Sequence, residues 1–135
     1  AHHNAGATSP SATTGHPADG GGGHHSWYFR PTIDVYHSGM GGALPVCLTE
    51  FGYVSREGYG ELPSNWSWGS GITVQNQADW LAEGVRIARS LGYVRLMIVW
   101  NVDFTYWGSD PQAGYAIVRP DGSCPACGTL GAAMQ

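Results

Sequence analysis

The sequence predicts a mixed α/β protein in which parallel strands alternate with helices. Two short, mostly apolar runs, 45–49 and 94–101, have the length and composition of buried strands. Between them, 74–91 has apolar residues at helical spacing, with Thr73 as a suitable N-cap and Gly92 as a terminator. A strand–helix–strand order implies parallel strands joined by right-handed crossovers.

The remaining elements complete this alternation within a single domain. A helix is expected over 27–38 despite Pro31, and a short last helix over 125–134. Residues 1–26 form a long loop rich in Gly and His, although Ala1-His2-His3 resembles the end of a strand. Two further loops, 53–72 and 102–114, carry aromatic residues among Gly, Ser and Asn or Asp.

Composition excludes several classes of function. The net charge is −4 with only six Lys and Arg, which argues against nucleic-acid binding because no cationic cluster exists to neutralise phosphates. No apolar run has the length of a membrane span. No HxH or HExxH spacing supports a metal site, and no cofactor is expected. Six Trp and seven Tyr suit stacking on sugar faces as well as core packing, so carbohydrate is the expected partner.

The three cysteines have different expected roles. Cys47 lies within the first predicted strand and is expected to be a buried free thiol. Cys124-Pro125-Ala126-Cys127 is a CxxC motif, which is compatible with a redox pair, half of a zinc site or a local disulfide. The motif lies near the chain end after a turn, and no second CxxC accompanies it.

Several segments together resemble one known family. Leu48-Thr49-Glu50-Phe51-Gly52 looks like the seventh-strand signature of clan A glycoside hydrolases, the retaining (β/α)8 glycosidases. Gln77-Ala78-Asp79-Trp80-Leu81 resembles the seventh helix of that clan, and Met97-Ile98-Val99-Trp100-Asn101 is similar to strand eight. Residues 115–123 resemble the closing segment before the last helix, and 23–30 look like the start of helix six in an uncharacterised bacterial branch.

The resemblance implies a partial (β/α)8 TIM barrel containing about the last three βα units. Residues 45–135 then run from strand seven to the final helix, after the 1–26 loop. A complete barrel needs roughly 200 residues or more, so such a chain is expected to be a fragment or to associate with copies of itself. Either a homo-oligomer that rebuilds a closed sheet or Gly-rich loops folded over the sheet would cover the exposed strands.

The same resemblance makes Glu50 the candidate nucleophile, because the clan's nucleophile ends strand seven. The structural alternative is a strand-end glutamate that pairs with an arginine or caps a turn. The clan's acid/base, in an Asn-Glu pair ending strand four, has no counterpart here. The second carboxyl group must then come from Glu61, Asp103 or another chain.

Aromatic and polar residues near the expected strand ends are the candidate sugar-binding groups. The resemblance places a histidine of His2-His3 in the pocket and Trp100 at a sugar subsite. The position of Trp100 at a strand end also favours the pocket, and packing in the core is the alternative. Trp66, Trp68 and Trp107 lie on loops, where they serve either binding or coverage of apolar surface. The full set is His2, His3, Tyr53, Trp66, Trp68, Trp100, Asn101 and Trp107.

Two functional hypotheses follow. The first is a retaining glycoside hydrolase acting on a β-linked glycan or β-glycoside. The second is a non-catalytic carbohydrate-binding or self-assembling module derived from a barrel. A redox or metal protein built on the CxxC motif is a distant third. Low charge, polar aromatic loops and a CxxC compatible with a disulfide favour an extracellular location.

Overall fold

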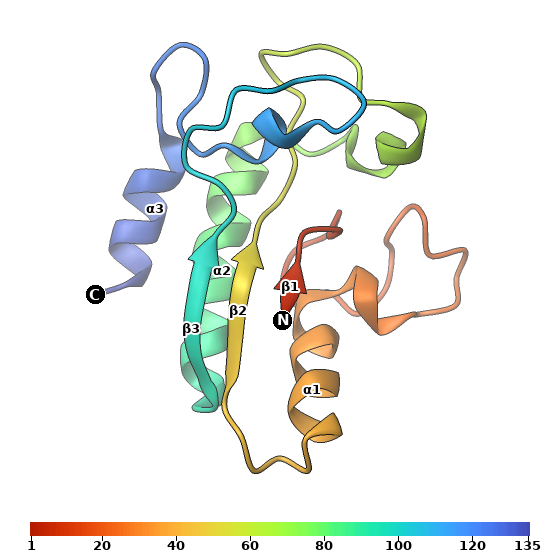
Figure 1. Ribbon diagram of the computed structural model, residues 1–135, viewed down its shortest axis with the longest axis vertical. Coiled ribbons are helices and arrows are strands. Elements are labelled where there is room, and N and C mark those ends of the chain that lie inside the picture. Colours follow the sequence, from red (N-terminus) through yellow and green to blue (C-terminus); the bar gives the residue numbers. More distant parts are fainter.

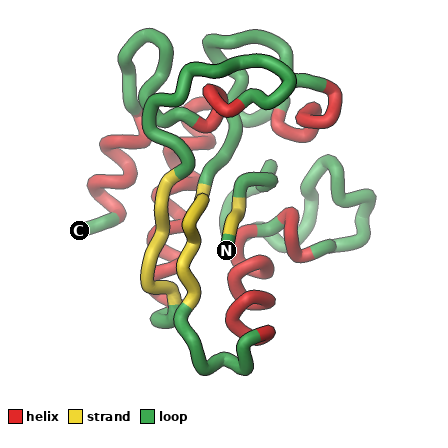
Figure 2. Tube along the Cα trace, viewed as in Figure 1, coloured by secondary structure: helices red, strands yellow, loops and turns green.

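The computed structural model describes all of residues 1–135 and contains a three-stranded parallel sheet flanked by helices (Figure 1 and Figure 2). The sheet order is β1-β2-β3. The α/β class and the parallel pairing predicted from the sequence are confirmed. The elements are β1 (His2–His3), α1 (Phe29–Gly39), β2 (Val46–Phe51), α2 (Val74–Leu91), β3 (Val94–Val99) and α3 (Pro125–Ala133), with short 3-10 turns at η1 (His25–Trp27), η2 (Ser64–Gly69) and η3 (Gln112–Tyr115).

Helix α2 has the bounds that its periodicity predicts. Thr73 Oγ1 accepts a hydrogen bond from the Asn76 backbone N–H at 2.9 Å, and Asn76 Oδ1 accepts one from the Thr73 N–H at 3.1 Å. This reciprocal capping box satisfies N–H groups that have no partner within the helix. Gly92 ends the helix with φ of 73°, a left-handed conformation that costs glycine little.

Removing the cap is expected to destabilise the protein modestly. Thr73→Ala deletes the acceptor for the Asn76 N–H, so the free energy of unfolding should fall by about 1 kcal/mol. Urea denaturation followed by circular dichroism measures this, with the exposed Thr14→Ala as control. Equal losses in the two variants would show that the capping bond contributes nothing.

Helix α1 starts slightly later than predicted, at Phe29. Trp27 belongs to the preceding turn η1, and Tyr28 is extended, with φ of −126° and ψ of 132°. Pro31 falls within the first turn of the helix, where its missing N–H leaves no intrahelical bond unmade. The predicted helix over 27–38 therefore exists but begins two residues further on.

Strand β2 runs to Phe51, so Glu50 lies within the strand and does not follow it. Pairing on both sides extends the strand, because His2 and His3 of β1 face Glu50 and Phe51, and Val99 of β3 also faces Phe51. The pairing with β3 is irregular between Leu48 and Phe51. With strict alternation, Glu50 would lie on the same buried face as Leu48, and Phe51 would lie on the exposed face. Because of the irregularity, Phe51 is buried in the core and Glu50 is half-buried at the end of the sheet.

The main hydrophobic core lies between the sheet and the helices. Figure 1 shows α2 behind β2 and β3, with α3 beside it. Gly84 of α2 allows the close approach of the Phe51 ring, since a Cβ at this position would meet that ring. All three α-helices and the central strand contribute to one cluster: Phe29, Ile33, Val46, Leu48, Phe51, Tyr53, Ala78, Leu81, Ala88, Ile117, Ala126 and Leu130.

The opposite face of β2 and β3 carries exposed side chains. Cys47 is a free thiol, as expected, but it is exposed, so its predicted burial is wrong. Cys47 pairs in register with Leu96, and Leu96 and Ile98 are each 46% exposed. The reason is that a strand of a parallel sheet is buried on both faces only when both faces are covered, and here helices cover one.

The CxxC motif forms a local disulfide at the start of α3. Cys124 and Cys127 are joined, and Pro125 occupies the first helical position, where proline is well tolerated. Thr129 Oγ1 donates to the Ala78 carbonyl at 2.7 Å, which ties α3 to α2. Of the three roles left open for the motif, the structure shows the disulfide.

We expect the disulfide to make a small contribution to stability. It closes a short loop, for which chain-entropy reasoning gives about 2 kcal/mol. Cys124→Ala combined with Cys127→Ala should lower the free energy of unfolding by that amount, and reductant should have the same effect on wild-type protein. Urea denaturation tests both. Cys47→Ala, the control, should leave the reductant effect intact.

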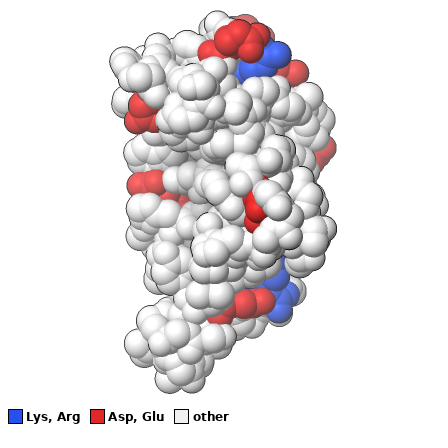
Figure 3. Space-filling view, turned by 90° about the vertical axis from the view of Figure 1, so that its right-hand side faces the viewer, with Lys and Arg blue, Asp and Glu red and all other residues white.

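Charged groups are few on the surface. Figure 3 shows one face on which they gather mainly at the two ends, with a largely uncharged middle interrupted by isolated carboxylates. None of the helices is sufficiently long and apolar to cross a membrane.

Candidate functional site

The carboxylate of Glu50 is held at the C-terminal end of the central strand by the segment that follows β1. Asn4 Nδ2 donates to Glu50 Oε2 at 2.6 Å, and His2 Nδ1 lies 3.3 Å from the same oxygen. Both partners reach Glu50 because β1 runs parallel to β2 and its end pairs with Glu50 and Phe51. In parallel α/β sheets, this edge is where binding and catalytic groups gather.

Gly52 permits the neighbouring strand ends to approach each other. The Trp100 N–H donates to the Phe51 carbonyl at 2.8 Å. A Cβ on Gly52 would collide with the Trp100 carbonyl oxygen and the Tyr115 ring. Gly52 is therefore required for the close packing of the strand ends next to Glu50.

A cavity of about 470 Å³ adjoins His2 and Asn4. Aromatic rings form much of its wall. The ring centroid of Trp66 lies 5.6 Å from that of Trp68 and 5.9 Å from that of Tyr115. No Asp or Glu lines it. The lining residues are His2, His3, Asn4, Ala5, Ser26, Trp27, Asn65, Trp66, Trp68 and Tyr115.

His16 braces two tryptophans of this wall. Its ring stacks on Trp27 at 4.4 Å and lies 5.6 Å from Trp68. Nδ1 accepts from the Ala18 N–H at 3.1 Å, so Nε2, 2.7 Å from the Ala5 carbonyl, is the nitrogen that donates. Burial lowers the pKa of His16. The Ala5 carbonyl and Asp19 raise this pKa, but by less than burial lowers it. The neutral ring therefore supports the wall at neutral pH.

His3 lines the cavity and has no hydrogen-bond partner on either ring nitrogen. It is 2% exposed and packs edge-on against Phe29 and Tyr53. Burial, with a smaller contribution from His16, lowers the pKa of His3 from 6.5 to about 4. The imidazole is consequently neutral at pH 7.

The two residues predicted to supply the second carboxyl group, Glu61 and Asp103, lie away from Glu50. Glu61 accepts from Arg56 Nη1 at 2.6 Å and is strongly exposed. Asp103 lines a different cavity, together with Tyr59 and Phe104. Neither contacts Glu50, whose polar partners are His2 and Asn4.

The other predicted sugar-binding residues are divided between the cavity and the scaffold. Trp66, Trp68, His2 and His3 line the cavity. Trp100 instead donates from Nε1 to Gln112 Oε1 at 2.6 Å. Asn101 makes loop bonds, donating to the Gln112 carbonyl and accepting from the Phe104 N–H. Trp107 stacks on Tyr59 at 4.7 Å, and Tyr53 is fully buried in the core.

Sequence reasoning missed Asn4, Trp27 and Tyr115. Asn4 carried a usable signal, because it directly follows the strand-like His2-His3 pair. Trp27 falls at the start of the helix predicted over 27–38, and Tyr115 falls in the stretch that resembles the family's closing segment. Asn4 and Tyr115 meet through a contact between segments 111 residues apart, the hydrogen bond from the Tyr115 hydroxyl to the Asn4 carbonyl.

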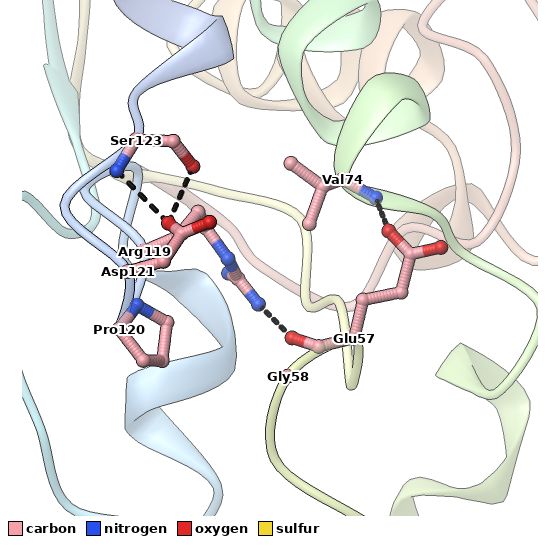
Figure 4. A pocket seen from close by; sticks show the side chains of 7 residues that line it. All are labelled: Glu57, Gly58, Val74, Arg119, Pro120, Asp121 and Ser123. Carbon is pink, nitrogen blue, oxygen red and sulfur yellow. Dashed lines mark hydrogen bonds between the residues drawn. The ribbon is translucent and has the colours of Figure 1, made fainter.

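A second cavity, of about 460 Å³, lies between the loop after β2 and the turn before α3 (Figure 4). Arg119 donates to the Glu57 carbonyl at 2.5 Å, Glu57 Oε2 accepts from the Val74 N–H at 2.5 Å, and Asp121 accepts from Ser123. These polar groups satisfy one another, which is typical of a structural junction.

No protein-family model, no curated protein and no solved structure matches this chain. The described residues contain no group of three or more His, Cys, Asp or Glu side chains placed to hold a metal ion. The functional assignment therefore depends on the geometry around Glu50.

Proposed function

We propose that this chain belongs to a retaining glycoside hydrolase of the (β/α)8 type, acts on a β-linked glycan or β-glycoside, and uses Glu50 as its nucleophile. The observation that carries the proposal is a carboxylate at the C-terminal end of a central parallel strand, with one oxygen bound by Asn4, beside a cavity with a tryptophan wall. This combination supplies a nucleophile and a surface on which a sugar ring can stack.

The barrel interpretation is supported by the arrangement of the strands. The three parallel strands are adjacent in chain order, as consecutive strands of a barrel are. The sheet face opposite the helices is uncovered, and Leu96 and Ile98 are exposed on β3. Further strands, from a longer chain or from another copy, would cover this face and close the sheet.

The proposal requires a second carboxyl group from outside the cavity described above. Retaining hydrolysis uses two carboxyl groups roughly 5–5.5 Å apart. Glu61 and Asp103 are engaged or located elsewhere, so a neighbouring chain segment is the better source of the acid/base. The Cys124–Cys127 disulfide supports an extracellular location for the protein.

The test is a hydrolysis assay on 2,4-dinitrophenyl β-glycosides and soluble β-glucans, combined with covalent trapping. The leaving group of these aryl glycosides needs no protonation. The first, nucleophilic step can therefore be observed even if the protein lacks a general acid. A 2-deoxy-2-fluoro β-glycosyl fluoride should form a stable ester at Glu50, detected by mass spectrometry of the digested protein. An unlabelled, inactive and well-folded protein would contradict the proposal.

The second candidate function is non-catalytic carbohydrate binding. It is favoured by one observation: the aromatic cavity is lined by no carboxylate. Titration calorimetry with cello- and xylo-oligosaccharides distinguishes the two functions. Binding that is retained in Glu50→Gln and lost in Trp68→Ala, without hydrolysis in wild type, would establish a binding module.

A further inference from the structure

The two oxygens of the Glu50 carboxylate have different surroundings. Oε2 accepts a hydrogen bond from Asn4 at 2.6 Å and lies 3.3 Å from His2 Nδ1. Oε1 makes no hydrogen bond within the protein, while Oε2 has two candidate donors. The carboxylate is therefore held by one oxygen and free at the other.

The orientation of the Asn4 amide follows from this contact. An ionised carboxylate only accepts hydrogen bonds, so the NH₂ group of Asn4 must face Oε2. The backbone of Asn4 is fixed in turn, because its carbonyl accepts from the buried Tyr115 hydroxyl. A rigid chain of contacts thus leads from Tyr115 through Asn4 to the carboxylate.

We propose that Asn4 is a positioning residue for Glu50, which holds Oε2 so that Oε1 is the atom that attacks the anomeric carbon. This inference rests on the proposed function and names how the same site orients its nucleophile. Asn4 acts through Glu50, and a short hydrogen bond to a charged acceptor is strong enough to fix the carboxylate plane. Misplacement of a reacting group by about 1 Å can cost roughly 100-fold in rate.

The reaction with a dinitrophenyl β-glycoside is balanced with water as the only other reactant. A lone pair of Oε1 forms the bond to the anomeric carbon while the bond from that carbon to the phenolic oxygen breaks. The bonding electrons leave with dinitrophenolate. Water then attacks the glycosyl ester, which releases the sugar, regenerates the Glu50 carboxylate and gives one proton to solvent.

The experiment compares wild type, Asn4→Leu and Asn4→Asp on 2,4-dinitrophenyl β-cellobioside. Asn4→Leu removes the donor, and we expect kcat to fall about 10- to 100-fold with KM changed less than threefold. The aromatic wall, which binds the sugar, remains intact. Gln75→Leu is the matched control, because Gln75 donates an equivalent amide bond to Asp79 at 2.9 Å on the exposed surface of α2. Its kcat should equal that of wild type.

Asn4→Asp adds a second measurement, the pH dependence of kcat, which would be unchanged if Asn4 had a purely structural role. At pH 7 the introduced carboxylate repels Glu50 and offers no donor, so the kcat ratio of variant to wild type should be low. Towards pH 4.5 the introduced carboxyl group becomes protonated and can donate to Oε2, and the ratio should rise at least fivefold. His2 and Tyr115 also face this carboxylate, and both are present in wild type and in the variant.

The outcomes separate the two proposals. Equal kcat values in wild type and Asn4→Leu, or a ratio that does not change with pH, would overturn the positioning role while Glu50 keeps its function. A folded wild type that neither hydrolyses nor is labelled would overturn the proposed function, and the positioning role with it. Asn4→Asp is nearly isosteric with the native residue, so it tests the role even if Asn4→Leu misfolds.

Discussion

Glu50→Gln is expected to lower kcat on activated β-glycosides by roughly 10⁴-fold or more, the scale seen when a covalent nucleophile is removed from an enzyme. The amide keeps the size of the side chain but cannot form the glycosyl ester. Asn4 and the tryptophan wall remain, so KM should change little. The measurement is release of dinitrophenolate at pH 7, with circular dichroism to confirm the fold.

A chemical rescue identifies the nucleophile directly. Glu50→Ala leaves space beside Asn4, and added azide should attack from the face that Glu50 occupied. The product is then an α-glycosyl azide, of inverted configuration, and the rate should rise with azide concentration. Glu61→Gln, whose native carboxylate pairs with Arg56, serves as the control and should retain wild-type kcat. Full activity in Glu50→Gln would exclude the nucleophile role.

Acidification from pH 6.5 to 4 is expected to destabilise the folded protein by about 3 kcal/mol through His3 alone. The pKa of this buried imidazole is lowered from 6.5 to about 4. Above pH 6.5, both folded and unfolded states hold the ring neutral, and the full stability is present. Below pH 6.5, the unfolded chain binds a proton that the folded state excludes, so stability falls until the folded pKa is reached. His16, whose pKa is also lowered by burial, acts in the same direction.

Urea denaturation at pH 7, 5.5 and 4 measures this effect. His3→Leu replaces the ring with an apolar side chain of similar size, so its free energy of unfolding should depend on pH less steeply, with the remaining slope attributed to His16 and to the carboxylates. The exposed His24→Gln should follow the wild-type curve. If His3→Leu also follows that curve, the buried imidazole is not the source of the acid sensitivity.

Local sequence signals determined most of the secondary structure. Helix α2 begins at Val74 and ends at Leu91, as expected, because its cap, its apolar periodicity and its terminating glycine all lie within about 20 residues of one another. The α/β class followed from the same local patterns. Such signals need no knowledge of distant contacts, since hydrogen bonds within a helix and its caps are made by neighbours in the chain.

Strand ends and side-chain exposure were decided by the tertiary structure. β2 extends to Phe51 because β1, more than 40 residues away in sequence, and β3 both pair with its end. Cys47 is exposed because the helices cover only the other face of the sheet. An apolar run predicts a strand but cannot say whether one or both faces are covered.

The sequence by itself determined the α/β class, the helix α2 and the placement of Glu50 near a strand end. Only the tertiary structure decided that Asn4 binds Glu50 and that Trp27 joins Trp66 and Trp68 in one wall. It also decided that Trp100 and Asn101 form structural hydrogen bonds to Gln112. The physical reason is that these roles depend on which polar atoms of distant segments meet, and burial forces such atoms to find partners only after the chain has folded.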